Sequence, residues 1–360
     1  MSEKRDEKTQ TCGYGLIGLC CSDCLLGPCR ISPFEKEAQR GICDDPADGM
    51  VVKNLFRKVT GEAWRGLADL KEALQNLLIY NAHPTKRKQP IIPEQKGIFE
   101  KYACPSGKSK KIQIRYLSKE MEKLFSIFLQ GKTPLLENLF PLNAFPFLTR
   151  SSFLSGSWVT GLLDIINRSS NESTDIKTLL EQCLQVSILT LLCEELRQDI
   201  HCLISEERIS QSDQKIYDMI RSLPKEPSPM IVLLSNEKSS SREWVHRTAQ
   251  SLEKDSAGKL LTFSIDGIEG LRELGKRLSE RWPLPVSEMK IVALISSSMA
   301  TWVLGAMALG FSVISYPALP IHGSERAEHF FSEVLKKEFG NPYFFSWRED
   351  VLNELLEFLK

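Results

Sequence analysis

Six of the ten cysteines in this 360-residue chain lie within its first 43 positions, and their spacing constrains the fold more than any other feature. They are Cys12, Cys20, Cys21, Cys24, Cys29 and Cys43. Cysteine thiolates hold iron-sulfur cubanes in sets of four, and a short spacing lets one loop wrap a cluster while a more distant ligand completes the site. The last four of the six cysteines fit this pattern. We therefore expect them to bind a [4Fe-4S] cluster.

Cys12 and Cys20 are left over, and two thiolates do not complete a second cubane. A second copy of the chain is one source of the missing pair. Cys20 and Cys21 are adjacent, and adjacent side chains on an extended segment point to opposite sides. This favours a different cluster for each of them. Glycines at 13, 15, 18, 27 and 41 let the backbone approach bridging sulfides closely.

Two other uses of the cysteines remain open. A disulfide framework needs an oxidising compartment, and residues 2 to 10 are hydrophilic and charged, without the apolar core of a signal peptide. Structural zinc usually takes two paired-cysteine knuckles, whereas this sequence has one such pair, followed by gaps of four and thirteen residues. The spacing therefore favours iron-sulfur clusters over both.

Residues 12 to 57, CGYGLIGLCCSDCLLGPCRISPFEKEAQRGICDDPADGMVVKNLFR, resemble the amino-terminal part of the anaerobic, nickel-dependent carbon monoxide dehydrogenase catalytic subunit. The resemblance implies that Cys21, Cys24, Cys29 and Cys43 bind one [4Fe-4S] cluster inside each subunit. It also implies that Cys12 and Cys20 pair with their copies across a twofold axis to hold one bridging cluster in a homodimer. Residues 301 to 324 are similar to the last nucleotide-fold-like domain of that family, and residues 173 to 203 loosely to its helical domain.

The sequence departs from this family where the catalytic site would be. The family holds its nickel-iron-sulfur cluster with a histidine and several cysteines of two α/β domains, and this chain has no cysteine after Cys202. Gly66 and Asp69 stand where the family has histidines that assist proton transfer, and Ser298 where it has a lysine. The chain is also shorter, which fits loss of the middle α/β domain. We therefore expect no catalytic residues and no nickel site.

Length, composition and charge narrow the function classes further. A chain of this length with 42% hydrophobic residues can bury more than one core. Its 46 basic and 46 acidic residues argue against a nucleic-acid partner. The basic residues Lys86 to Lys88, Lys108, Lys110 and Lys111 are read as a solvated loop. No apolar run reaches the length of a membrane span, so we expect a soluble, cytoplasmic protein.

Hydrophobic periodicity predicts a multi-domain α and α/β chain. It divides into a cysteine-rich cluster-binding segment (1–46), a helical domain (47–222) and a Rossmann-like parallel-sheet domain (229–360). Helices are expected near 47–80, 116–130, 152–168 and 174–203, with a polar loop or two short elements at 83–112. Apolar runs at 230–234, 260–265, 291–295 and 311–314 alternate with helices at 242–252, 268–280 and 299–309, followed by a helix (325–337), a strand (342–346) and a closing helix from 350. No GxGxxG follows the first strand, so a dinucleotide site is not supported.

The remaining candidate ligands show no constellation. Cys104 lies alone in a polar loop, and Cys183, Cys193 and Cys202 are read as core cysteines on one helix. The five histidines are scattered: His83, His201, His246, His322 and His329.

These patterns favour an iron-sulfur electron-transfer homodimer without a catalytic nickel site. Its expected redox partner is a protein such as a ferredoxin or a full-length carbon monoxide dehydrogenase. Two alternatives remain: an anaerobic carbon monoxide dehydrogenase-like oxidoreductase with an altered active site, or an assembly or sensing partner of a full-length homologue.

Overall fold

The computed structural model describes 12–23, 25–35, 39–83, 91, 93–125, 140–141, 143–145, 175–205, 216, 218, 220–235, 247–251, 261–265, 268–296, 299–316, 319, 321, 324–339 and 344–345. Cys24, Ser298, His246, His322 and the predicted helices at 152–168 and from 350 lie outside these residues.

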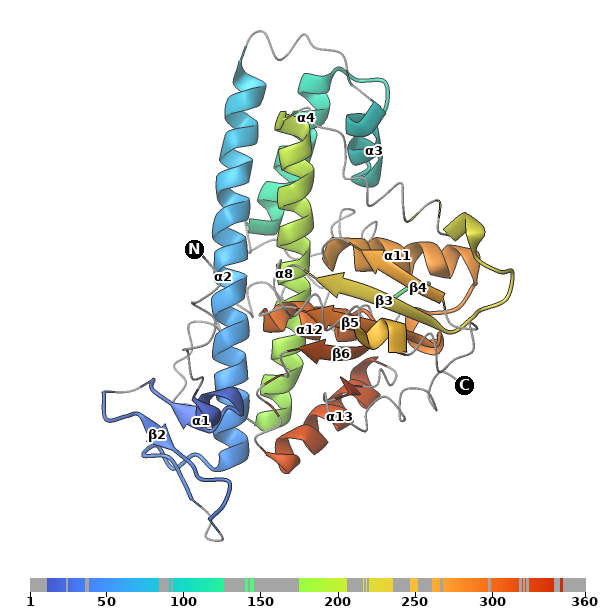
Figure 1. Ribbon diagram of the computed structural model, residues 1–360. Helices are drawn as coiled ribbons and strands as arrows, with labels where there is room; N and C mark the ends of the chain where they lie inside the picture. Colours follow the sequence, from blue (N-terminus) through green and yellow to red (C-terminus); the bar gives the residue numbers. More distant parts are fainter. Residues whose placement is uncertain are drawn as a thin grey trace, which may run out of the picture.

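Two long helices, α2 (Ala47–Ala82) and α8 (Ile176–Ser205), pack side by side and form the axis of the molecule (Figure 1). They run in the same direction, because Asp48 near the start of α2 and Lys177 near the start of α8 both pair with α13 (Glu325–Phe339). On α2, Leu55, Val59 and Ala63 are buried at a spacing of four, so they lie on one buried face of the helix.

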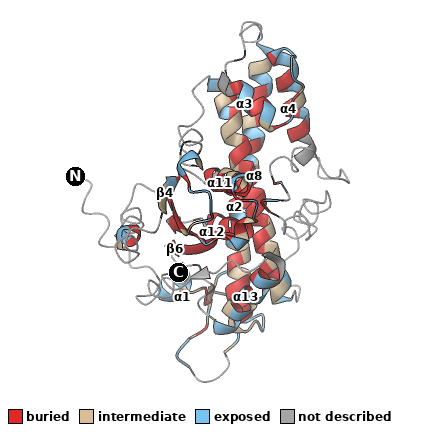
Figure 2. Cartoon of the chain, turned by 90° about the vertical axis from the view of Figure 1, so that its right-hand side faces the viewer, coloured by how far each residue is buried: buried red, intermediate tan, exposed pale blue. Residues whose placement is uncertain are grey.

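The helix α8 is buried on most of its circumference, as the burial colouring of Figure 2 shows. Its length and composition would suffice for a membrane span, a possibility that the sequence analysis overlooked. However, 67% of its most apolar window is buried inside the protein. This burial is typical of the core helix of a globular protein, since α2 and α12 (Ala300–Ala308) pack along it.

The predicted parallel sheet is confirmed. Its order is β4-β3-β5-β6-β7, and every neighbouring pair is parallel. The strands are β3 (Met230–Ser235), β4 (Leu261–Ile265), β5 (Ile291–Ser296), β6 (Ser312–Tyr316) and β7 (Phe344–Phe345). Because the chain leaves β3 for β4 on one side and then adds β5 on the other, the order reverses between β3 and β5. Such a reversal is the usual ligand-binding point of doubly wound sheets.

The helix α12 joins the sheet to the helix pair. It contacts α8 and α2 as well as β5 and β6, and α11 (Ile268–Arg281) lies beside it against α8. Gly305 allows the close approach, because a Cβ there would lie 2.7 Å from Cδ1 of Leu191 on α8. The helix ends at Ala308, and Gly310 (φ 91°) follows it, where Gly310 N–H donates to Met307 O and Phe311 N–H to Ala306 O. Buried apolar residues of the helices and the sheet form one continuous core.

Helix α3 (Pro93–Lys101) lies where the sequence predicts a polar loop or two short elements, and α4 (Lys110–Phe125) overlaps the helix predicted near 116–130 but begins earlier. The start of α4 corrects the reading of the basic residues at 108 to 111 as a solvated loop. Lys110 is buried in the first turn of α4, and its Nζ lies 3.1 Å from the Tyr80 hydroxyl. The lysine stem thus packs across α2 rather than into water.

Candidate iron-sulfur centre

The cysteine-rich segment folds as a short helix and a hairpin against the start of α2 (Figure 1). Cys12 immediately precedes α1 (Gly13–Leu16), and the hairpin pairs β1 (Cys20–Cys21) with β2 (Cys29–Arg30) in antiparallel register. Cys21 lies directly opposite Cys29, and Cys20 lies opposite Arg30. Since neighbours on a strand point to opposite faces, Cys20 and Cys21 serve different sides of the hairpin.

Hydrogen-bond donors approach two of the candidate ligand sulfurs. The backbone N–H of Ile42 donates to Cys29 Sγ at 3.4 Å, which brings the turn that carries Cys43 against β2. Arg57 Nη1 lies 3.3 Å from Cys21 Sγ. Donors of both kinds stabilise negative charge on sulfur, and hydrogen bonds to sulfur help set the potentials of iron-sulfur clusters.

Cys43 has a different partner. Its thiol donates to Asp45 Oδ2 at 3.1 Å, and this hydrogen bond to the Asp45 carboxylate raises the pKa of Cys43. Asp45 in turn accepts from Lys53 Nζ at 2.7 Å with both carboxylate oxygens. Metal binding would replace the Cys43 proton, leaving Asp45 paired to Lys53.

Three polar residues of one α2 turn hold the segment in place. Lys53 binds Asp45, as above, and Asn54 Nδ2 donates to the carbonyls of Gly18 (2.8 Å) and Cys20 (2.9 Å). Arg57 pairs with Asp23 at 2.8 Å and so reaches the loop between Cys21 and Cys24. The role of these three residues was not predicted from the sequence. The sequence feature that could have identified them is a set of polar side chains at positions i, i+1 and i+4 of the helix that follows Cys43.

The donor types fit an iron-sulfur site, although the described residues do not complete one. Within the described ranges, no three His, Cys, Asp or Glu side chains gather as metal ligands. Cys24 lies outside the described residues, so the predicted set of four is represented by Cys21, Cys29 and Cys43. The fit rests on thiols from one hairpin and its adjoining turn, on the backbone N–H donor to Cys29, and on the cation at Cys21.

Several large apolar side chains of this cysteine-rich segment are exposed in the single chain. They are Leu16, Leu25, Leu26, Phe34 and Ile42. Cys12 is exposed as well, and Cys20 is half-buried. Exposed apolar groups in such number are typical of a protein–protein contact surface.

Among the other cysteines, Cys183 and Cys193 are fully buried in α8, as expected for core cysteines. Burial raises the pKa of Cys183, and burial together with nearby Glu194 raises the pKa of Cys193 to about 12. Burial and the Glu120 charge raise the pKa of Cys104 to about 12 as well. These thiols therefore stay protonated and unreactive at neutral pH. Cys202 is only half-buried.

Comparison with known proteins connects part of this chain to one family. Carbon monoxide dehydrogenase 1 of Carboxydothermus hydrogenoformans is 39% identical over 115 residues, covering 31% of this chain and 17% of that protein. Carbon monoxide dehydrogenase 2 of the same organism is 48% identical over 52 residues (14% and 8%), and carbon monoxide dehydrogenase 1 of Methanosarcina mazei is 39% identical over 61 residues (17% and 10%). The chain resembles the carbon monoxide dehydrogenase family, and each match spans less than a fifth of the relative's length. No family model matches.

Solved structures of the same family align over more of the chain. A nickel-free carbon monoxide dehydrogenase from Thermococcus sp. AM4 aligns with 93% of this chain and 57% of its own length, at 15% identity and a TM-score of 0.46. Carbon monoxide dehydrogenase IV from Carboxydothermus hydrogenoformans gives the same coverage and identity, with a TM-score of 0.45.

Proposed function

We propose that the chain is an iron-sulfur electron-transfer protein of the carbon monoxide dehydrogenase type, without a catalytic nickel site. Cys21, Cys24, Cys29 and Cys43 would hold a [4Fe-4S] cluster in each subunit, and Cys12 and Cys20 would share a second cluster with their copies across a homodimer. Bound clusters supply one-electron transfer. The observation that carries this proposal is the complete six-cysteine spacing, in a chain that is 48% identical to a carbon monoxide dehydrogenase over 52 residues.

The residues of this chain would position and tune the clusters. The positive charge of Arg57 lies at the sulfur of Cys21, and the backbone N–H of Ile42 points its positive end at the sulfur of Cys29. The hairpin register places Cys20 and Cys21 on opposite faces, which supports separate clusters for the two, the one at Cys20 being shared with a neighbouring subunit. The exposed apolar side chains around the segment support the same dimer face. We also propose the division at 1–46, 47–222 and 229–360, a cytoplasmic location, and a small redox protein as partner.

Metal content of anaerobically purified protein tests this proposal. We expect about six irons per chain, four from the internal cubane and half of a shared one, with negligible nickel and a reduced-cluster signal by electron paramagnetic resonance. Cys29→Ser should lose about four irons and Cys20→Ser about two, the latter with dissociation of the dimer. Cys104→Ser is the matched control and should keep the wild-type content.

Three outcomes contradict the proposal. Negligible iron removes the clusters altogether. Bound nickel with carbon monoxide-dependent viologen reduction favours an oxidoreductase with an altered active site. A stable heterodimer with a full-length homologue, in place of the homodimer, favours the assembly or sensing role.

A further inference from the structure

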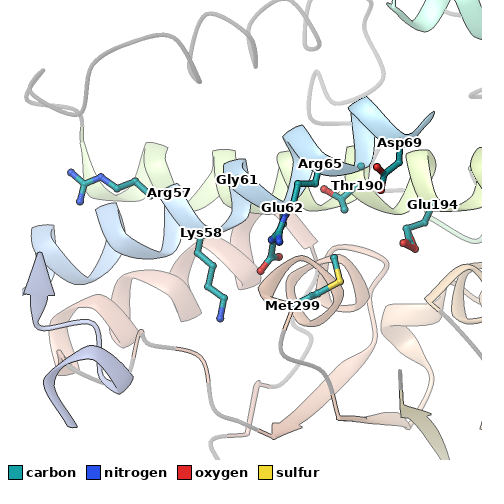
Figure 3. Close-up of a pocket in the computed structure, with 10 residues that line it drawn as sticks. Arg57, Lys58, Gly61, Glu62, Arg65, Asp69, Thr190, Glu194 and Met299 are labelled. Atoms are coloured by element: carbon teal, nitrogen blue, oxygen red, sulfur yellow. The ribbon is translucent and has the colours of Figure 1, made fainter. Parts of the chain in front are cut away.

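A cavity of about 680 Å³ lies between α2, α8 and the start of α12 (Figure 3). Ligand pockets in proteins have volumes of roughly 300–1,000 Å³. Met299, which lines this cavity, stands three positions after the end of β5. The cavity thus lies near the carboxyl end of β5, one of the two strands between which the strand order reverses. Ligands of doubly wound sheets bind at such a reversal.

One stripe of α2 carries the charges of this cavity. Lys58, Glu62 and Arg65 are spaced by four and three residues, so they share a helix face. In this spacing Glu62 would ordinarily pair with either basic neighbour. It instead accepts hydrogen bonds from two backbone N–H groups at the start of α12, from Ala300 at 3.2 Å and Thr301 at 2.9 Å. Glu62 is only 3% exposed and is committed to this contact.

The two basic residues are left available as a result. Neither Lys58 nor Arg65 makes a hydrogen bond or ion pair with any other part of the chain that the structure describes, and both are exposed at the cavity. Figure 3 shows Lys58 and Glu62 extending from α2 toward the side of α12. The third basic residue of the lining, Arg57, is bound to Asp23.

The carboxylates of the lining do not balance these two cations. Glu62 is committed to α12, and Glu194 pairs with Arg197 at 3.5 Å. Asp69 alone remains exposed and uncommitted among the described residues. The cavity therefore offers two available positive charges and one available negative charge to a ligand.

We propose that this cavity binds a small oxyanion, a compound with a phosphate or carboxylate group, through Lys58 and Arg65. A guanidinium donates in a planar fork that matches either group, and an ammonium adds a compact charge. Gly61 and Gly66 leave the wall of the cavity without side chains. The site does not depend on the clusters.

Calorimetric titration of the full chain, purified anaerobically, tests the proposal. Inorganic phosphate and succinate are titrated separately at constant ionic strength set with chloride, so that the two arms separate phosphate from carboxylate recognition. We expect saturable binding of at least one probe. The double variant Lys58→Gln/Arg65→Gln should bind it at least about tenfold more weakly, because both charge-assisted hydrogen bonds are removed. Lys71→Gln, an exposed lysine of the same helix outside the cavity, is the matched control and should bind as the wild type.

A second variant keeps the charges and fills the space. A Cβ built at Gly61 meets no atom within 4 Å, so Gly61→Leu is tolerated by the fold and obstructs the cavity. We expect it to weaken binding while both cations remain. Absence of saturable heat with both probes, or wild-type affinity in the double variant or in Gly61→Leu, overturns the proposal.

Discussion

Arg57 is the residue that connects the long helix most directly to the cysteine-rich segment. It donates to Cys21 Sγ at 3.3 Å and to Asn54 Oδ1 at 3.1 Å, and it pairs with Asp23 at 2.8 Å. Its guanidinium offers several fixed donors, which lets one side chain serve a sulfur, an amide and a carboxylate together. If Cys21 binds a cluster, a cation beside its sulfur stabilises the reduced, more negative form.

Arg57→Gln should therefore lower the reduction potential of the internal cluster. Hydrogen bonds to charged groups contribute about 1.5–3 kcal/mol, and about 59 mV corresponds to about 1.4 kcal/mol for one electron, so a decrease of roughly 60–130 mV is expected. Arg57→Lys keeps the charge and should shift the potential less. Redox titration followed by electron paramagnetic resonance measures both, with Lys71→Gln as control. An unchanged potential at full iron content would show that Arg57 has no tuning role.

At the residue scale, the sequence predicted the cysteines as ligands because their spacing is informative in itself. It could not predict Lys53, Asn54 or Arg57, because their role depends on how α2 packs against the hairpin. A basic residue on a helix is ordinarily solvated, and only the packed register directs Arg57 to Cys21. The same holds for Asp45, whose contact with Cys43 follows from the turn before α2.

At the scale of elements, Glu62 of α2 caps α12 across a sequence separation of 238 residues. A carboxylate at the amino terminus of a helix satisfies free N–H groups and interacts favourably with the helix dipole. No side chain of α12 itself provides this cap, since its N-cap residue is Met299. The contact therefore fastens the sheet part of the chain to the helix pair.

Glu62→Ala should lower the free energy of unfolding by about 2 kcal/mol, because it leaves two buried N–H groups without an acceptor. Glu62→Gln keeps one acceptor oxygen and should cost about half as much. Urea denaturation followed by circular dichroism measures both changes. Glu72→Ala, an exposed glutamate on the same helix, should be nearly neutral. Equal stability of Glu62→Ala and Glu72→Ala would mean that the cap does not stabilise the fold.

Periodicity predicted most described elements closely, and it failed where tertiary packing decides. The strands β3, β5 and β6 begin within one residue of the predicted apolar runs, because a buried parallel strand is apolar throughout. The helix α4 begins six residues before its predicted start near 116, at Lys110 and Lys111, which continue the polar stretch before them. Their helical state depends on packing against α2, which sequence alone does not reveal.

At the scale of the whole molecule, a buried charge network joins three helices that the sequence analysis treated separately. Glu195 of α8 accepts from Arg272 of α11, with Arg272 Nε at 2.6 Å, and pairs with Lys101 of α3 at 2.6 Å. Asp199, one turn further along α8, accepts from Lys101 at 2.7 Å and from the Tyr102 hydroxyl. Charged residues are usually predicted at the surface, so neither the burial nor the partners of this network could be predicted.

This network makes stability depend on pH in the acid range. Burial raises the pKa of Glu195, but the Arg272 and Lys101 charges outweigh it and lower that pKa to about 2, from an ordinary value of 4.5. A carboxyl group whose pKa is lowered by folding stabilises the folded state above its unfolded pKa. That contribution is lost as the pH falls from about 4.5 toward about 2. The wild type should therefore lose stability progressively across this window.

Glu195→Gln tests the origin of that dependence. Glu195 and Arg272 are only 4% and 2% exposed, so the variant leaves a buried guanidinium with Glu273, at 3.3 Å, as its remaining counter-charge. We expect a loss of about 3–5 kcal/mol at pH 7, and a difference from the wild type that shrinks below about pH 4.5 as Glu195 protonates. Urea denaturation at pH 7, 4 and 3 measures this difference, with Glu100→Gln as control, since Glu100 forms an exposed pair with Lys96 at 3.6 Å.

The double variant Glu195→Leu/Arg272→Met removes both charges and should recover much of the loss, because an apolar pair avoids the desolvation cost. A difference between wild type and Glu195→Gln that stays constant with pH would assign the acid dependence to other groups.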